Sequence, residues 1–175
     1  MSYHTIPLGK KAPETINTVI EIPKGGHNKY EYDEELDEIR LDRTLHSPLF
    51  YPVDYGFVPE TRAEDGDHLD ALVLTDDPVF TGCVMEIRPI GLLKMSDENG
   101  LDNKVLAVPA KNPHYHDIQD LKDVQPHFLA EIVHFFEQYK KLEKKFVKVE
   151  GWGSKKNALA VIKKANARYL REHHG

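Results

Sequence analysis

Short runs in which apolar and polar residues alternate, separated by turn residues, occupy the first two thirds of the chain. Alternation of this kind is typical of strands that bury one face. It predicts a series of short strands over residues 17–23, 29–33, 39–46, 53–58, 69–74, 84–95 and 104–108. Gly, Pro and acidic residues lie between these runs and predict the turns.

Helical spacing appears only near the end of the sequence. Behind Pro126, which can occupy a first helical turn, apolar residues recur at three- and four-residue steps as far as Tyr139. A second helix is predicted from Ser154 to about Glu172. Strands followed by helices predict an α+β domain with an antiparallel sheet or small barrel, rather than alternating βαβ units.

The length of 175 residues suits one domain, so we expect a single domain over residues 1–175. No apolar run approaches the roughly 20 residues that cross a bilayer, and no signal segment is evident. We therefore expect a cytoplasmic protein without membrane contacts. Cys83 is the one cysteine, which excludes an intrachain disulfide and a multi-cysteine metal site.

The balance of charge disfavours one class of partner. The chain has 23 Lys and Arg against 29 Asp and Glu, a net charge of −6. This is the wrong sign for a protein that binds the nucleic-acid backbone, so we expect no nucleic-acid partner. Lysines concentrate after Tyr139, where solvated helix faces would account for most of them.

The densest cluster of chemically useful side chains is Asp65, Asp67 and Asp70, three carboxylates within six residues. Like charges this close are costly unless something neutralises them. Hard cations such as Mg²⁺ do so with oxygen ligands, which makes the segment a candidate metal site. An acidic surface turn is the alternative that the segment alone leaves open.

A second acidic pair depends on the register of a hairpin. Asn99 and Gly100 form a strong turn signal between two apolar runs. If they form the turn, Asp97 lies opposite Asp102, and a shared cation would relieve their repulsion. Lys104 would share a face with Asp102. A longer loop would change this register.

Basic residues complete the pattern. Alternation places Arg43 on the apolar face of its strand, where it requires a salt bridge or a bound anion. Lys29 and Glu31 lie on the same face of their own predicted strand, residues 29–33. Carboxylates facing Arg and Lys suit a ligand with several phosphates bridged by metals. The chain lacks the GxxxxGK[ST], GxGxxG and GxSxG motifs, which argues against P-loop, dinucleotide-dependent and α/β-hydrolase chemistry.

The segment 65–71, DGDHLDA, closely resembles the signature of the soluble, metal-dependent inorganic pyrophosphatases of family I. The likeness continues in the family's order through residues 19–23, 29–31, 42–43, 50–52, 54–56, 91–102, 134–136, 139–140 and 147–152. It implies a small antiparallel five-stranded OB-like β-barrel with flanking α-helices. The implied activity is Mg²⁺-dependent hydrolysis of pyrophosphate to two orthophosphates, with Mn²⁺ or Zn²⁺ as substitutes. Short, bacterial-type members are usually hexamers, so a homo-oligomer is expected.

The resemblance also implies a role for each residue that matches the motif. One metal would be held by Asp65, Asp70 and Asp102. Asp70 would reach a second metal, and Asp97 with Asp102 a third. Two metals would share the attacking water, whose proton Asp67 accepts. The remaining matched residues complete the acidic ring or bind the phosphates: Glu21 and Glu31 in the ring, and Lys29, Arg43, Tyr55, Lys104, Tyr139 and Lys140 around the substrate.

Two departures and two alternatives accompany this interpretation. His68 stands where the family usually has Pro, and we expect it to be an uninvolved loop residue because Mg²⁺ prefers oxygen. Gln138 and Lys141 lie on the helix expected to form subunit contacts, which leaves the contact itself open. An OB-type binding module or another metal-dependent phosphohydrolase are the alternatives. A carboxylate-rich lining separates the enzyme from the nucleic-acid module.

Overall fold

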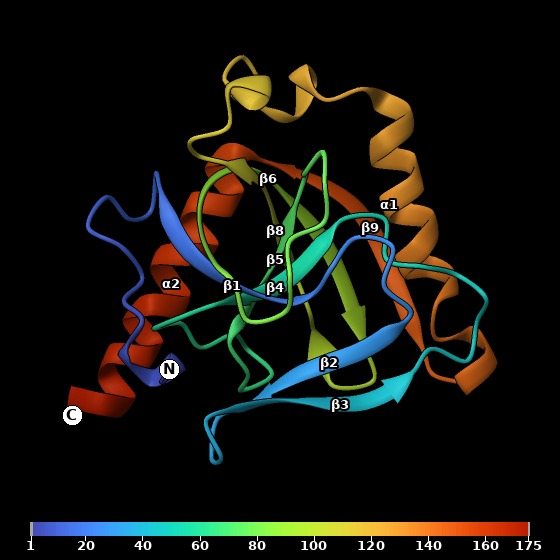
Figure 1. The fold of residues 1–175 in the computed structure, drawn as a ribbon, viewed down its shortest axis with the longest axis horizontal. Coiled ribbons are helices and arrows are strands. Elements are labelled where there is room, and N and C mark those ends of the chain that lie inside the picture. Colours follow the sequence, from blue (N-terminus) through green and yellow to red (C-terminus); the bar gives the residue numbers. More distant parts are fainter. Residues whose placement is uncertain (1, 175) are drawn as a thin grey trace.

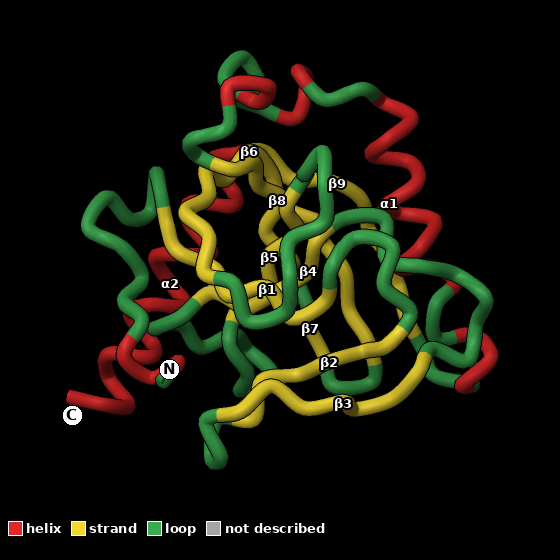
Figure 2. Tube along the Cα trace, viewed as in Figure 1, coloured by secondary structure: helices red, strands yellow, loops and turns green. Residues whose placement is uncertain are grey.

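Five central strands form a closed ring in the structure, a computed structural model that describes residues 2–174 (Figures 1 and 2). They are β1 (Ile16–Ile22), β4 (Asp54–Val58), β5 (Leu69–Val73), β8 (Lys104–Pro109) and β6 (Val84–Asp97). Each pairs with the next in that order, and β6 pairs with β1 to close the ring. This confirms the predicted α+β class, although the arrangement is ring-like rather than a regular barrel and β5 pairs with β8 in parallel.

Four further strands extend the ring or lie beside it. The short β7 (Gly100–Leu101) and the longer β9 (Val147–Ser154) both pair with β6. In contrast, β2 (Asn28–Asp33) and β3 (Glu38–Thr44) form a separate two-stranded sheet beside the ring (Figure 1). This hairpin therefore covers the ring without belonging to it.

Two α-helices flank the ring on different sides in Figure 1. The first, α1 (Pro126–Gln138), buries Ile132, Phe135 and Phe136. The second, α2 (Lys155–His174), buries Ala158, Ile162 and Ala165 beside β6. Short 3₁₀ turns lie at Tyr3–Thr5, Pro113–Tyr115, Leu121–Asp123 and Lys141–Glu143. Within residues 2–174, no helix has the length and apolar character needed to span a bilayer.

The strands β5 and β8 bury both of their faces. On β5, Leu69, Ala71 and Val73 join one hydrophobic cluster with α2, whereas Leu72 joins the cluster that contains α1. Successive side chains of a strand point to opposite faces, so a strand between two clusters is apolar throughout. Asp70 interrupts this pattern on β5, and its register partner on β8 is Lys104. The polar site is thus built directly into the ring.

The predicted strands are confirmed to within a few residues, but β9 and the two-residue β7 were missed. Val147 and Val149 of β9 pack on the α1-containing cluster, whereas Lys148 and Glu150 are exposed. The alternation is regular for only four residues before Gly151, a run too short to identify a strand from periodicity alone. Ser154 ends this strand, and its hydroxyl then accepts a hydrogen bond from the backbone N–H of Asn157 at 3.3 Å as α2 begins.

The register expected for the hairpin around Asn99 was wrong: the turn begins one residue earlier, so the partner of Asp97 is shifted by two positions. Asp97 pairs with Gly100, so Asp97 and Asp102 are not directly opposite each other. The physical reason is local: the Asp97 carboxylate accepts a hydrogen bond from the backbone N–H of Asn99 at 2.8 Å and moves the turn back by one residue. Gly100 follows the turn with φ of 113°, which a residue with a side chain rarely adopts.

Candidate active site

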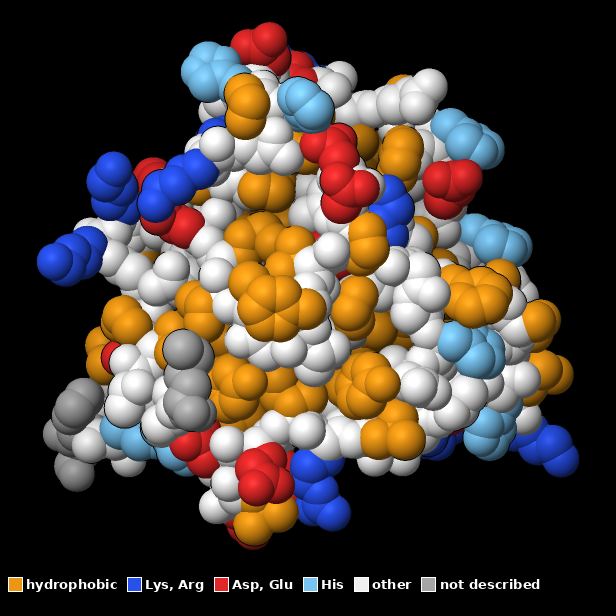
Figure 3. Space-filling model, in the orientation of Figure 1, with side chains coloured by type: hydrophobic (Ala, Val, Ile, Leu, Met, Phe, Trp, Pro, Cys, Tyr) orange, Lys and Arg blue, Asp and Glu red, His pale blue; other side chains and the backbone are white. Residues whose placement is uncertain are grey.

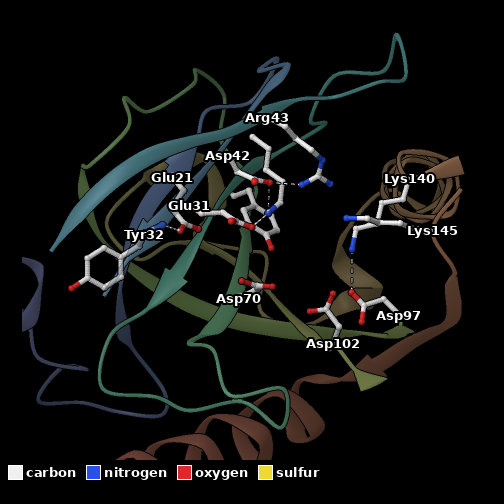
Figure 4. Close-up of polar contacts among 12 residues, drawn as sticks. Glu21, Glu31, Tyr32, Asp42, Arg43, Asp70, Asp97, Asp102, Lys140 and Lys145 are labelled. Atoms are coloured by element: carbon white, nitrogen blue, oxygen red, sulfur yellow. Dashed lines mark hydrogen bonds and ion pairs between the residues drawn. The ribbon is translucent and has the colours of Figure 1, made fainter. Parts of the chain in front are cut away.

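A cavity of about 290 Å³ lies between the ring and the β2–β3 hairpin. Figure 4 shows carboxylates from several strands directed into this space, with lysines beside them. Its lining contains eight carboxylates and three lysines: Glu21, Glu31, Glu34, Asp65, Asp67, Asp70, Asp97, Asp102, Lys29, Lys104 and Lys140. The cavity therefore carries a dense negative charge that is only partly neutralised by side chains.

The structure brings together all but one of the residues that the sequence nominated. The twelve that line the cavity are Glu21, Lys29, Glu31, Tyr55, Asp65, Asp67, Asp70, Asp97, Asp102, Lys104, Tyr139 and Lys140. Arg43 is the one candidate residue that is not part of the described lining of the cavity. The residues come from segments that are far apart in the sequence, and the closure of the ring places them around one space.

Lys104 is the centre of the charge arrangement on the floor of the cavity. Its Nζ lies 2.6 Å from Asp70 Oδ2 and 2.8 Å from Asp102 Oδ1, with the Tyr55 hydroxyl at 3.4 Å. Burial alone would lower the pKa of Lys104, but Asp102 and Asp70 outweigh it and raise that pKa well above the usual value. Burial raises the pKa of Asp102 to about 6. Lys104 is thus held as a buried cation.

The acidic loop before β5 presents Asp65 and Asp67. The backbone N–H of Asp67 donates to Asp65 Oδ1 at 3.1 Å, and the N–H of Ala63 donates to the Asp67 carbonyl at 2.7 Å. Gly66 between them has φ of 97°, which favours glycine. Removal from water and, after it, neighbouring carboxylates raise the pKa values of both aspartates.

Glu21 on β1 is the most deeply buried acid of the site. It is 6% exposed, and its Oε1 accepts a hydrogen bond from the backbone N–H of Tyr32 at 2.7 Å. Burial, followed by the nearby charge of Asp70, raises the pKa of Glu21 to about 8. Beside it, Lys29 forms an ion pair with Glu31, which lies on the same face of β2. Burial, together with Arg43, lowers the pKa of Lys29.

The opposite wall is formed by the end of β6 and the residues that follow α1. Lys140 Nζ lies 3.1 Å from Asp97 Oδ2 and 3.9 Å from Glu98 Oε1. Burial opposes ionisation of Asp97, but its hydrogen bonds from Asn99 and Lys140 outweigh it and lower its pKa. Tyr139 is 4% exposed, belongs to the α1-containing cluster and also lines the cavity.

Arg43 differs from the sequence expectation in its surroundings. A register shift pairs Arg43 with Lys29 but Leu41 with Tyr30, so Arg43 and Leu41 lie on opposite faces of the hairpin instead of sharing an apolar face. Leu41 is 56% exposed. Arg43 forms ion pairs with Asp42 and with Glu143, whose Oε1 lies 2.7 Å from Arg43 Nε. Arg43 therefore forms the salt bridge that the sequence left open as the alternative to a bound anion. Arg43 is also the register partner of Lys29, which lines the cavity.

His68, which the sequence predicts to be a loop residue without a role in metal binding, is held in place by local contacts. Its Nδ1 is 2.9 Å from the Thr61 carbonyl, and its ring stacks with Tyr32 and Phe57. Burial lowers the pKa of His68. The ring is thus fixed in the wall of the cavity by aromatic packing, with Nε2 3.7 Å from Glu34.

Sequence reasoning missed several lining residues: Tyr32, Glu34, Phe57 and Asn99. For Phe57 a signal existed, because it lies two residues after Tyr55 and so shares its strand face. The others depend on the hairpin and on the turn after Asp97, whose placement the sequence pattern did not define.

The donor set fits hard divalent cations. Nearly every candidate ligand is a carboxylate oxygen, which Mg²⁺ and similar ions prefer over nitrogen or sulfur. Within the described residues, no three His, Cys, Asp or Glu are already gathered in a ligating cluster. The contacts explain this, since Lys104, Lys140 and Lys29 each hold carboxylates that would otherwise converge.

Fold and site together define an α+β protein whose polar cavity suits a polyanion accompanied by cations. A family model described as "Inorganic pyrophosphatase" matches residues 18–170. The chain therefore belongs to the inorganic pyrophosphatase family, a family of hydrolytic enzymes.

Individual relatives and a solved structure match this chain over nearly its whole length. It is 52% identical over 157 residues to an inorganic pyrophosphatase of Methanosarcina acetivorans, covering 90% of this chain and 94% of that protein. It is 51% identical over 168 residues to that of Thermus thermophilus, covering 94% and 96%. The crystal structure of the inorganic pyrophosphatase from Thermus thermophilus superposes with a TM-score of 0.93 at 49% identity, covering 97% of this chain and 99% of that one.

Proposed function

We propose that this chain, acting as one catalytic domain over residues 1–175, hydrolyses pyrophosphate to two orthophosphates with bound divalent cations, Mg²⁺ foremost. The observation that carries the proposal is the cavity in which eight carboxylates face three lysines. Carboxylates attract cations, cations attract phosphate oxygens, and lysines supply further positive charge at the phosphates. Membership of the pyrophosphatase family supports the choice of substrate.

The metal ligands in this proposal are the carboxylates that surround the cavity floor. Asp65, Asp70 and Asp102 would hold one cation, Asp70 would also reach a second, and Asp97 with Asp102 would hold another. Glu21 and Glu31 would complete the acidic ring. When bound, the cations would make water a better nucleophile and would neutralise charge on the phosphates. Mn²⁺ and Zn²⁺ are proposed as substitutes for Mg²⁺.

The chain's own residues bind and orient the substrate. Lys104 and Tyr55 lie together on the floor, and Lys140 and Tyr139 lie together on the wall. Their ammonium and hydroxyl groups are donors suited to phosphate oxygens. Lys29 and Arg43 would bind phosphate from the hairpin side, and Arg43 would exchange part of its contact with Asp42 for the substrate.

Asp67 is the residue proposed to accept the proton from the attacking water. Its carboxylate lines the cavity, and its pKa is raised by removal from water and by Asp70. A raised pKa makes a carboxylate a stronger base while it remains ionised near neutral pH. Neither of the hydrogen bonds described above for this loop uses the Asp67 carboxylate, which leaves it able to face a water molecule.

Self-association is part of the proposal. Phe50 and Phe128 are exposed by 58% and 38% and line an apolar groove of about 670 Å³ beside α1. Figure 3 shows further apolar side chains gathered near the centre of the face viewed there. Apolar areas of this kind are typical of subunit contacts. We expect a homo-oligomer, most simply a hexamer, to bury this groove.

A cytoplasmic location is also part of the proposal.

A comparison of three substrates tests the proposed activity. The purified chain would be given pyrophosphate, tripolyphosphate or ATP, each with Mg²⁺, and phosphate release would be followed. We expect pyrophosphate to be hydrolysed with the highest kcat/KM, because the cavity is small and its lining is polar. A preference for ATP would instead favour a nucleotide phosphohydrolase.

A further inference from the structure

Arg62 lies outside the cavity but contacts three separate parts of the molecule. Its Nη1 and Nη2 donate to the two oxygens of Glu34 at 3.0 and 3.1 Å. Its Nε donates to Glu172 Oε2 at 2.9 Å. Its Nη1 also donates to the Gly66 carbonyl at 2.9 Å. One guanidinium thus joins the β2–β3 connection, the last turns of α2 and the acidic loop.

The geometry of these contacts is specific to arginine. The paired contact with Glu34 uses the planar fork of the guanidinium, and the side chain is only 13% exposed. A fork held on both sides has little freedom to rotate. The third contact, to Gly66, is therefore made from a fixed position rather than by a mobile surface side chain.

The contact with Gly66 reaches the metal-binding carboxylates through a single peptide group. The carbonyl of Gly66 and the N–H of Asp67 belong to the same planar peptide unit. Arg62 donates to that carbonyl, and on the other side the N–H donates to Asp65 Oδ1 at 3.1 Å. Fixing the plane of this peptide consequently fixes the direction of the hydrogen bond that orients Asp65.

We propose that Arg62 is a positioning residue that orients Asp65 for cation binding by anchoring the Gly66–Asp67 peptide to the β2–β3 connection and to α2. The proposal rests on the proposed function, in which Asp65 is a cation ligand. Because Gly66 has no side chain and a positive φ, its peptide has wide conformational freedom unless it is held. Arg62 supplies that restraint from outside the cavity.

Electrostatics alone predicts the opposite outcome, which makes the proposal easy to test. Replacing Arg62 by a neutral residue removes a positive charge and frees two carboxylates, Glu34 and Glu172, near the cation sites. Charge alone would therefore strengthen Mg²⁺ binding. Loss of positioning would weaken it, since the loop would have to be ordered when the cation binds.

The experiment is titration calorimetry of Mg²⁺ into the full chain without pyrophosphate, using Arg62→Gln and Arg62→Lys. We expect Arg62→Gln to bind Mg²⁺ about tenfold more weakly, the loss that one charge-assisted hydrogen bond represents. Arg62→Lys should also bind Mg²⁺ more weakly, because it loses the planar fork that holds the peptide. Since it keeps the positive charge, this loss cannot be attributed to a change in charge. In both variants kcat at saturating Mg²⁺ should approach that of the unaltered chain.

Lys164→Gln is the matched control. Lys164 Nζ lies 2.8 Å from Glu64 Oε1, so this pair also joins α2 to the acidic loop, but it does not contact the Gly66–Asp67 peptide. Its removal should leave Mg²⁺ affinity unchanged. Glu172→Gln removes one anchor of Arg62 while the arginine stays in place, and it should weaken Mg²⁺ binding by a smaller factor.

Unchanged or tighter Mg²⁺ binding by Arg62→Gln would overturn the proposal, even if its thermal unfolding temperature fell. If Arg62→Gln does not fold, Glu172→Gln decides in the same way. Since no pyrophosphate is present, the titration gives an answer that does not depend on hydrolysis. A chain that binds Mg²⁺ as expected but leaves pyrophosphate intact would disprove the proposed function and retain the role of Arg62.

Discussion

Asp70 and Lys104 are direct register partners in the parallel pair of β5 and β8, and Lys104 Nζ lies 2.6 Å from Asp70 Oδ2. The contact places the buried ammonium group of Lys104 against a carboxylate that is proposed to bind Mg²⁺. Lys104 therefore neutralises Asp70 and Asp102 in the structure. A divalent cation would take over that task and leave the ammonium group able to bind phosphate.

The first prediction concerns the stability of the metal-free chain. Lys104→Met leaves Asp70 and Asp102 without their buried partner, which costs about 3–5 kcal/mol of unfolding free energy. Mg²⁺ should recover a larger part of the unfolding temperature in this variant than in the unaltered chain. Thermal denaturation in EDTA and in excess Mg²⁺ measures both effects. Lys111→Met, which removes an exposed pair with Glu86, is the control, and an equal Mg²⁺ effect in both variants would refute the idea.

The second prediction separates two roles of Arg43. Arg43→Lys should lower kcat/KM by a factor that corresponds to about 1–3 kcal/mol, because the planar fork for phosphate is lost. Glu143→Gln breaks the salt bridge of Arg43 and keeps the guanidinium, so its kcat/KM should fall less. Steady-state kinetics on both folded variants decides. An unchanged kcat/KM for Arg43→Lys would assign Arg43 to the salt bridge alone.

The third prediction distinguishes the aspartates of the acidic loop. Asp65→Asn and Asp70→Asn replace charged ligands by neutral ones, so added Mg²⁺ should restore part of their activity. Asp67→Asn should bind Mg²⁺ nearly as well and yet turn over more slowly by roughly two to four orders of magnitude, as expected for loss of a general base. Mg²⁺ titration of activity across pH compares all three. Rescue of Asp67→Asn to the original rate by excess Mg²⁺ would make Asp67 a ligand instead.

The fourth prediction follows from the pKa of Glu21, which burial raises from 4.5 to about 8. Between these values the folded chain keeps a proton that the unfolded chain has lost, so this group's contribution is complete below pH 4.5 and is lost as pH rises to about 8. In EDTA, the unfolding temperature of the unaltered chain should therefore fall over this range relative to Glu21→Gln. Parallel curves for the two proteins would show that Glu21 ionises normally.

Much of the fold followed from periodicity, because β5 and β8 are apolar on both faces and α1 has a regular apolar stripe. The site could be nominated because its residues cluster in motifs, as Asp65, Asp67 and Asp70 do. The register at Asp97 could not be predicted, since a single side-chain hydrogen bond to Asn99 moved the turn.

The role of Arg62 depends on longer-range contacts. Its partners Glu34 and Glu172 lie 28 and 110 positions away. No local pattern marks such a contact, because it exists only once the hairpin and α2 are packed on the acidic loop. Sequence periodicity identifies which faces are buried, whereas the polar contacts between distant segments require the folded chain.

The most direct test of the account is phosphate release from pyrophosphate by the purified chain, measured after EDTA treatment and again after Mg²⁺ is added back. The carboxylate-lined cavity predicts that hydrolysis stops in EDTA and returns with excess Mg²⁺. Hydrolysis at the full rate in EDTA would contradict the proposed role of the carboxylates, and no hydrolysis under either condition would contradict the proposed activity.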